Sequence, residues 1–122
     1  MTFRTHVRES AEVIILDVSG RIVLGDGAKQ LSGKIVELVS QGHNKILLNL
    51  AEVTYVDSSG LGELVSSYGT VKKANGKIKL LNIQPKIADL LRMTRLDAVF
   101  ESFSEESRAL SSFQDNGQAA SA

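Results

Sequence analysis

Two adjacent hydroxyl side chains, Ser58 and Ser59, have a type and a position in the sequence that could support a chemical reaction or binding. They follow Asp57 and precede Gly60-Leu61-Gly62, between an apolar run that predicts a strand and a periodic segment that predicts a helix. The start of a helix has unpaired backbone N–H groups and the positive end of the helix dipole, so it favours capping side chains, carboxylates and phosphates. Such a turn could hold a nucleophile, an incoming phosphate or the loop of a partner.

A serine nucleophile on a strand-to-helix turn needs a histidine base. The only histidines are His6 and His43, and neither follows Ser58, although the order nucleophile, acid, histidine requires one there. The glycine that leads the nucleophile elbow is also missing, because Val56 occupies its position. The sequence therefore argues against a serine hydrolase.

The glycine-rich stretches match nucleotide-binding loops poorly. Residues 20–25 have the two-glycine spacing of a P-loop, but Asp26-Gly27 follows where lysine and a hydroxyl residue are required. Gly60 and Gly62 are followed by Val65, so the third glycine of a dinucleotide motif is missing. We expect no nucleotide or other cofactor, no metal and no small-molecule substrate.

Asp57 can also be compared with the phosphorylated aspartate of a response regulator. That chemistry needs magnesium held by further acids at neighbouring strand ends, and Asp17 is the only acid of the second predicted strand. Asp57 is more simply interpreted as the N-cap of the following helix. Capping explains Asp57 but not both serines, and the two glycines after them predict an open surface at the helix end.

The remaining elements must position this turn. Alternating and continuous apolar runs predict strands at residues 3–8, 13–18, 45–50 and 77–83, the first two joined as a hairpin. A helical stripe predicts a first helix from its N-cap Asp26 to Gln41, and Pro85 suits the first turn of a third helix. The second helix should bury a stripe and leave Glu63, Ser66 and Ser67 at the rim; the stripe consists of Leu61, Leu64, Val65, Tyr68, Val71 and Lys72.

This order predicts an α/β fold, a single-domain mixed sheet that is mostly parallel, with an antiparallel N-terminal edge hairpin and helices packed against it. The domain should span residues 1–113 and include a short last helix that ends at Phe113, followed by a mobile tail at 114–122. Sites in such sheets gather outside the carboxyl ends of the strands, where Asp57 falls.

Composition limits the partners. The 14 basic side chains equal the 14 acidic ones, so no net field attracts nucleic acid or an anionic membrane. Cysteine is absent, which fits a reducing cytosol. No apolar run approaches the length of about 20 residues that a spanning helix needs, and no signal peptide is visible. We expect a cytoplasmic protein that binds neither nucleic acid nor membrane.

The segment 56–62, Val-Asp-Ser-Ser-Gly-Leu-Gly, resembles the signature of STAS domains, specifically of the anti-sigma factor antagonists. The resemblance covers residues 3–103 and includes the hairpin, the Gly20 loop, the helix headed by Asp26, the Asn75-Gly76 turn and the proline-led helix, all in family order. It implies a regulatory binding module in bacteria that is not an enzyme.

The resemblance also implies a mechanism of partner switching. An anti-sigma factor with serine kinase activity would phosphorylate Ser58, with Ser59 as the second candidate, and a serine phosphatase would reverse the reaction. The unphosphorylated antagonist would bind the anti-sigma factor and free the sigma factor. The implied partner-binding residues are Asp57, Ser58, Ser59, Gly60, Leu61, Gly62 and Asp26.

Two alternatives remain open at this point. A STAS scaffold or partner-switching module could control an output that involves no sigma factor, and the sequence of this chain does not distinguish it from an antagonist. A nucleotide-binding enzyme would turn over ATP or GTP, which we do not expect.

Overall fold

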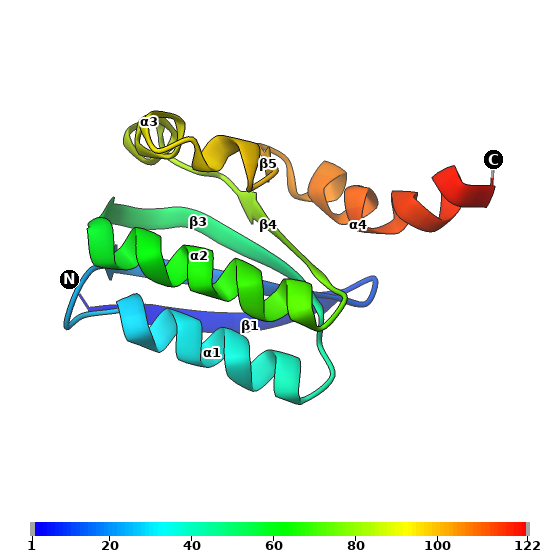
Figure 1. Cartoon of the computed structure of the whole chain (residues 1–122), viewed down its shortest axis with the longest axis horizontal. Helices are drawn as coiled ribbons and strands as arrows, with labels where there is room; N and C mark the ends of the chain where they lie inside the picture. The colour runs from blue at the N-terminus through cyan, green and yellow to red at the C-terminus, as the bar shows by residue number, and fades with distance from the viewer. Residues whose placement is uncertain (1, 122) are drawn as a thin grey trace.

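The computed structural model describes residues 2–121, with side chains for residues 2–114. Its described strands form one five-stranded sheet in the order β1-β2-β3-β4-β5, in which β1 is antiparallel to β2 and all other neighbours are parallel (Figure 1). The strands are β1 (Arg4–Ser10), β2 (Val13–Ile22), β3 (Lys45–Val56), β4 (Lys77–Leu81) and β5 (Ser102–Phe103). The predicted mixed sheet with its N-terminal hairpin is confirmed.

Helices connect the parallel strands, as the pattern predicted. They are α1 (Ala28–Ser40), α2 (Ser58–Lys73), α3 (Pro85–Met93), the short 3₁₀ helix η1 (Leu96–Ala98) and α4 (Glu106–Ser121). Figure 1 shows α1 and α2 running side by side along the sheet. Within the described residues, no helix is long and apolar enough to cross a membrane.

Some strands differ from the prediction. β3 continues to Val56 instead of ending at Leu50, because Val53 and Val56 still point into the core after a register shift between β2 and β3. The sequence did not predict β5, which pairs with β4 through only Ser102 and Phe103. A strand of two residues has no periodicity that a sequence pattern could show.

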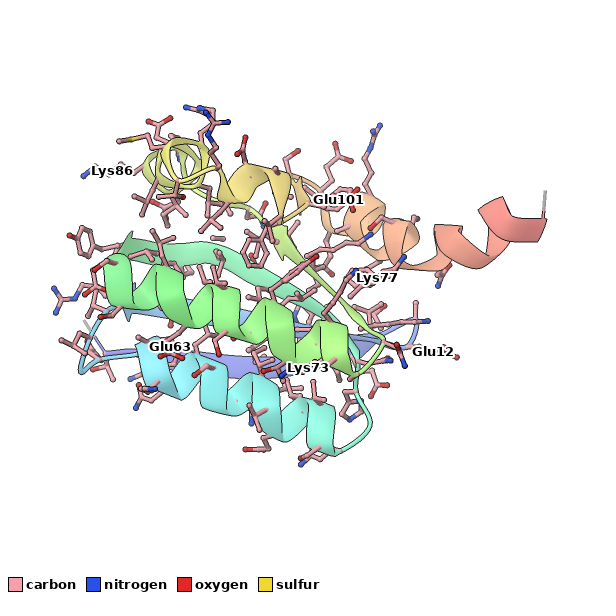
Figure 2. All side chains as sticks on the ribbon, in the orientation of Figure 1. Glu12, Glu63, Lys73, Lys77, Lys86 and Glu101 are labelled. Carbon is pink, nitrogen blue, oxygen red and sulfur yellow. The ribbon has the colours of Figure 1, made fainter. Side chains whose placement is uncertain are left out.

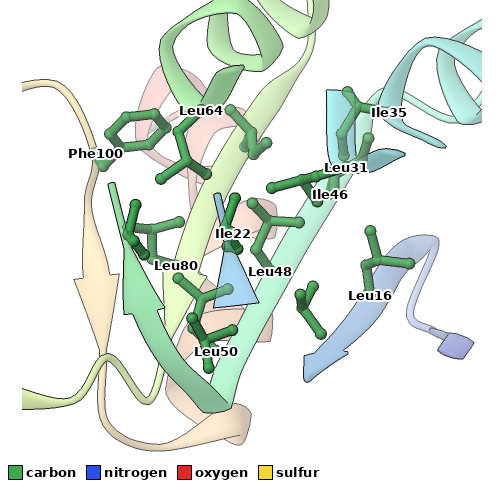
Figure 3. Packing of buried hydrophobic residues seen from close by; sticks show 14 of the residues in the cluster. Leu16, Ile22, Leu31, Ile35, Ile46, Leu48, Leu50, Leu64, Leu80 and Phe100 are labelled. Atoms are coloured by element: carbon green, nitrogen blue, oxygen red, sulfur yellow. The ribbon is translucent and has the colours of Figure 1, made fainter. Parts of the chain in front are cut away.

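The larger core lies between the sheet and helices α1 and α2, with α3 and Phe100 closing one side. Alternate residues of the central strands point into it, and they meet the buried stripes of the helices. Figure 3 shows Leu64 of α2 and Leu31 and Ile35 of α1 above the strand residues. The labelled strand residues are Leu16, Ile22, Ile46, Leu48, Leu50 and Leu80.

A smaller core lies on the other face of the sheet, where α4 packs. It consists of Val13, Ile15, Leu47, Leu81, Ala109 and Phe113. Helix α4 continues to Ser121, past the end predicted at Phe113. The predicted tail at 114–122 falls mostly on residues whose side chains lie outside the description, so its mobility stays a prediction.

Candidate functional site

Asp57 turns the chain from β3 into α2. Its Oδ1 accepts a hydrogen bond of 2.8 Å from the Gly60 backbone N–H, and its carbonyl accepts the first helical bond, of 2.9 Å, from Leu61. Its extended backbone (φ −100°, ψ −174°) is that of an N-cap. The predicted capping role of Asp57 is confirmed.

The second oxygen of the same carboxylate holds the loop that follows β2. Asp57 Oδ2 accepts a bond of 3.1 Å from the Leu24 backbone N–H, and the Asp57 N–H donates to the Ile22 carbonyl at 3.3 Å. The N–H groups of Gly60 and then Leu24 lower the pKa of Asp57, because they stabilise its charged form. One carboxylate therefore fixes the helix start and the neighbouring loop in one arrangement.

The two serines differ in access. Ser58 is the first residue of α2 and is exposed, whereas Ser59 is half-buried. Both lie in the first turn, where backbone N–H groups and the helix dipole favour a negative group. Leu61 follows them, half-buried against the larger core.

The two glycines of the motif serve different purposes. A Cβ atom on Gly60 would lie 2.0 Å from the Ile22 carbonyl oxygen, so the missing side chain lets α2 approach β2 closely. The expectation that Gly60 leaves an open surface is therefore wrong. A Cβ on Gly62 would meet no atom within 4 Å, and Gly62 is exposed.

Asp26 does not cap α1, contrary to the prediction. The N-cap is Gly27, whose φ of 107° suits glycine, and no side chain caps this helix. Asp26 instead belongs to a tight turn, in which its backbone exchanges two hydrogen bonds of 3.0 and 3.1 Å with Val23. Its carboxylate lies 4.0 Å from the Arg21 guanidinium.

The tight turn presents a side chain that the sequence analysis missed. Leu24 is 76% exposed, although it is a leucine, and its backbone is bonded to Asp57. An apolar residue between turn-forming glycines is the sequence signal that could have identified it. Leu24 and Ser58 are thus both exposed, and Asp57 bonds both the Leu24 backbone and the first turn of the helix that begins at Ser58.

On α2, the assignment of residues to the rim was partly wrong. Ser67 is 1% exposed and donates to the Glu63 carbonyl at 2.8 Å, whereas Val65, predicted to be buried, is 43% exposed. Ser66 is exposed as predicted. Glu63 lies between α2 and α1 (Figure 2), where the Ser32 hydroxyl and the Lys29 ammonium lower its pKa.

A small apolar pocket flanks the site. It has a volume of about 230 Å³ and lies between the end of β3 and α3. Tyr55 and Val56 line it from β3, and Ile87 and Leu90 from α3. Val56 directly precedes Asp57, so this pocket, Leu24 and Ser58 lie around the same end of the sheet.

The histidines lie away from Ser58. His43 precedes β3 and Ser58 follows it, so a strand of 12 residues separates them, and His6 is part of the edge strand β1. This placement agrees with the argument against a serine hydrolase. Among the described residues, no group of three or more His, Asp or Glu side chains could hold a metal ion.

Comparisons with known proteins agree with the motif. The family model described as "STAS domain" matches residues 4–109. The chain belongs to the STAS domain family. This STAS domain is 31% identical over 101 residues to the anti-sigma-B factor antagonist of Bacillus subtilis, an alignment that covers 83% of this chain and 91% of the relative.

Solved structures show the same fold. A putative anti-sigma factor antagonist from Thermotoga maritima is similar to this STAS domain with a TM-score of 0.84 and 22% identity, over 90% of this chain and 94% of that chain. The Bacillus cell fate determinant SpoIIAA in its phosphorylated form gives a TM-score of 0.66 and 21% identity, over 88% of this chain and 96% of that chain.

Proposed function

We propose that this protein is a phosphorylation-controlled anti-sigma factor antagonist. In its unphosphorylated form it binds an anti-sigma factor with serine kinase activity, and the kinase releases it by phosphorylating Ser58. A serine phosphatase restores the binding form. The similarity to an anti-sigma-B factor antagonist along most of both chains supports this role.

The exposure of Ser58 at the first residue of α2 is the observation that carries the proposal. A kinase must reach the hydroxyl, and Ser59 is less accessible because it is half-buried. The helix start tolerates the product, since a phosphate there lies near unpaired N–H groups and the positive end of the dipole. Modification at Ser58 therefore changes the surface and leaves the fold intact.

Charge explains why phosphorylation would weaken binding. A phosphate adds a charge of about −1.5 to −2 at pH 7, directly beside the Asp57 carboxylate. An interface fitted to a neutral hydroxyl would have to bury this charge or face it with another acid. We expect a loss of about 3–4 kcal/mol in binding free energy, which corresponds to a hundredfold or greater loss of affinity.

The surface around Ser58 gives the partner further contacts. Leu24 offers an exposed apolar side chain on a turn whose backbone is fixed by four hydrogen bonds, so little order has to be gained on binding. Asp26 lies in the same turn, and Gly62 leaves room on the outer face of α2. We assign the partner interface to this turn and the first turns of α2.

Phosphopeptide mapping tests the proposal. The protein is incubated with ATP and an anti-sigma factor kinase of its own organism, and mass spectrometry locates the phosphate. We expect phosphate on Ser58 in the unmodified protein and in Ser59→Ala, and none in Ser58→Ala. Phosphate on neither serine would contradict the switching mechanism. A promoter reporter for the sigma factor then distinguishes an antagonist from a module with another output.

A further inference from the structure

Helix α4 is attached to its face of the sheet by a small apolar contact. Of its residues with described side chains, only Ala109 and Phe113 are buried, and they meet Val13, Ile15, Leu47 and Leu81. Leu110 is half-buried beside them. The apolar part of this attachment therefore depends mainly on one phenylalanine.

An ionic contact fixes the first turn of α4. The Arg8 guanidinium, on the edge strand β1, lies 2.9 Å from one oxygen of Glu106 and 3.2 Å from the other. The same guanidinium binds both oxygens of Asp17, at 2.7 and 2.9 Å, which keeps it oriented towards α4. Arg8 and Glu106 are both more than a third exposed, so water competes for this contact.

A buried lysine holds the next turns. Lys79 of β4 is 7% exposed, and its ammonium donates to the Ser112 hydroxyl at 2.9 Å and to the Ser112 carbonyl at 3.2 Å. The ammonium also lies 4.9 Å from the centre of the Phe113 ring and 3.1 Å from Glu101. Lys79 thus binds a polar residue of α4 that lies next to Phe113, the main apolar contact of this helix.

The contacts of α4 have the spacing that is typical of an amphipathic helix bound in a groove. The residues of α4 that face the sheet are Glu106, Ala109, Leu110 and Phe113, at positions i, i+3, i+4 and i+7. Arg8 binds the carboxylate, the buried apolar residues of the sheet pack against the three following positions, and Lys79 donates a hydrogen bond to the helix backbone. The connection before the helix, Ser104-Glu105, is exposed, and the Glu105 carbonyl accepts the first helical hydrogen bond, of 3.0 Å, from the Ala109 N–H.

We propose that this face of the sheet is a helix-binding groove, that α4 occupies it as a ligand from the same chain, and that a partner helix can replace α4. The partner helix carries a carboxylate at its first turn and apolar residues three, four and seven positions later. Arg8 supplies the charge complementarity, and Lys79 pairs with a hydroxyl or carbonyl oxygen of the incoming helix. The groove is independent of the Ser58 site.

A fluorescent peptide of residues 104–122 tests the proposal with the full chain. Two variants of the protein are compared: Phe113→Ala, which weakens its own α4, and Ser111→Ala, which changes an exposed position of the same helix. We expect the peptide to bind Phe113→Ala at least tenfold more tightly than Ser111→Ala. A peptide with Glu106→Ala and Phe113→Ala should lose this binding at least tenfold. Equal binding of the peptide to both proteins, or no binding to either, would overturn the proposal.

Hydrogen exchange on the unmodified protein provides a second test that does not depend on the folding of a variant. The amides of α4 should exchange through an opening that leaves the amides of α2 and β3 protected. Salt should raise the rate of this opening, because it screens the contact between Arg8 and Glu106. Exchange of α4 only together with α2 and β3 would contradict a detachable helix.

Discussion

Helices α2 and α4 have the same length, 16 residues, and pack against opposite faces of one sheet, but different interactions hold them. Helix α2 begins at a capping carboxylate and buries Gly60, Leu64 and Val71 in the larger core. Helix α4 buries Ala109 and Phe113 and otherwise depends on the half-exposed contacts of Arg8 and on Lys79.

The difference has a consequence for function. A serine that a kinase must recognise needs a rigid platform, and apolar packing with a fixed cap gives α2 that rigidity. A helix that opens needs contacts that water can replace, as the contact between Arg8 and Glu106 is. Each helix is held by the type of interaction that suits its proposed role.

The packing of Leu64 provides the largest expected effect. Leu64 is fully buried in the larger core, so Leu64→Ala should lower the free energy of unfolding by about 2–5 kcal/mol. Urea denaturation followed by circular dichroism measures the loss. The matched substitution Val65→Ala, at an exposed position of the same helix, should change the stability by less than about 0.5 kcal/mol. Similar losses for both variants would contradict the assigned orientation of α2.

Substitutions at the two motif glycines also test how α2 packs. Gly60→Ala places a Cβ against the Ile22 carbonyl and should destabilise the protein by about 1–3 kcal/mol. Gly62→Ala meets open space and should stabilise the protein by about 0.5–1 kcal/mol, because alanine favours a helix. Thermal unfolding of the pair reports both signs. If both variants were destabilised, the structure would be wrong in placing only Gly60, and not Gly62, in close contact with a neighbouring element.

The contact between Arg8 and Asp17, which orients Arg8 towards Glu106 of α4, should make the attachment of this helix depend on pH. Hydrogen bonds from Arg8 lower the pKa of Asp17, so this contact contributes stability above the ordinary aspartate pKa and loses it as the pH falls through the lowered value. Since both groups are partly exposed, we expect this contact to contribute about 0.5–1 kcal/mol to stability. Hydrogen exchange of α4, followed from pH 5 to well below the ordinary aspartate pKa and corrected for the intrinsic exchange rate, measures this contribution. Arg8→Met should abolish the dependence, and an unchanged profile in that variant would contradict this cause.

The most local effect concerns the loop at Leu24. Asp57→Ala removes the acceptor for both the Leu24 and the Gly60 N–H groups, so these two amides should exchange faster while α4 amides do not change. The sign of the pH dependence follows from the lowered pKa of Asp57: protection of the Leu24 amide is lost as the pH falls through that value. Amide exchange by NMR checks both points, with Ser59→Ala as the control. Retained protection at Leu24 in Asp57→Ala would show that another group holds the loop.

The structural features that the sequence predicted correctly are those that depend on residues close together in the chain. The N-cap at Asp57 and the proline at the start of α3 are local features, and both are confirmed. Asp26 was the exception, because a tight turn at Val23 and a glycine at position 27 compete with it for the helix start. The residue types at the helix start did not show that Gly27, one position after Asp26, is the N-cap.

Features that depend on distant residues were not predictable. Ser67 was different, because it continues the buried helical stripe of Gly60, Leu64 and Val71; its position indicated burial, and its polar side chain misled the prediction. Arg8 and Glu106 are 98 positions apart, and Lys79 meets Ser112 across 33 positions. Such pairs arise only when the sheet brings the elements together, so the groove under α4 emerged from the structure.

The central claim is that a negative charge at Ser58 separates this protein from its anti-sigma factor kinase, and calorimetry tests it most directly. Titration of the kinase with Ser58→Ala, Ser58→Asp and the matched Ser59→Asp compares three variants of the exposed helix start. We predict that Ser58→Ala binds like the unmodified protein and that Ser58→Asp binds at least a hundredfold more weakly, with a smaller loss for Ser59→Asp. Equal affinities of Ser58→Ala and Ser58→Asp, or a larger loss for Ser59→Asp, would contradict the account.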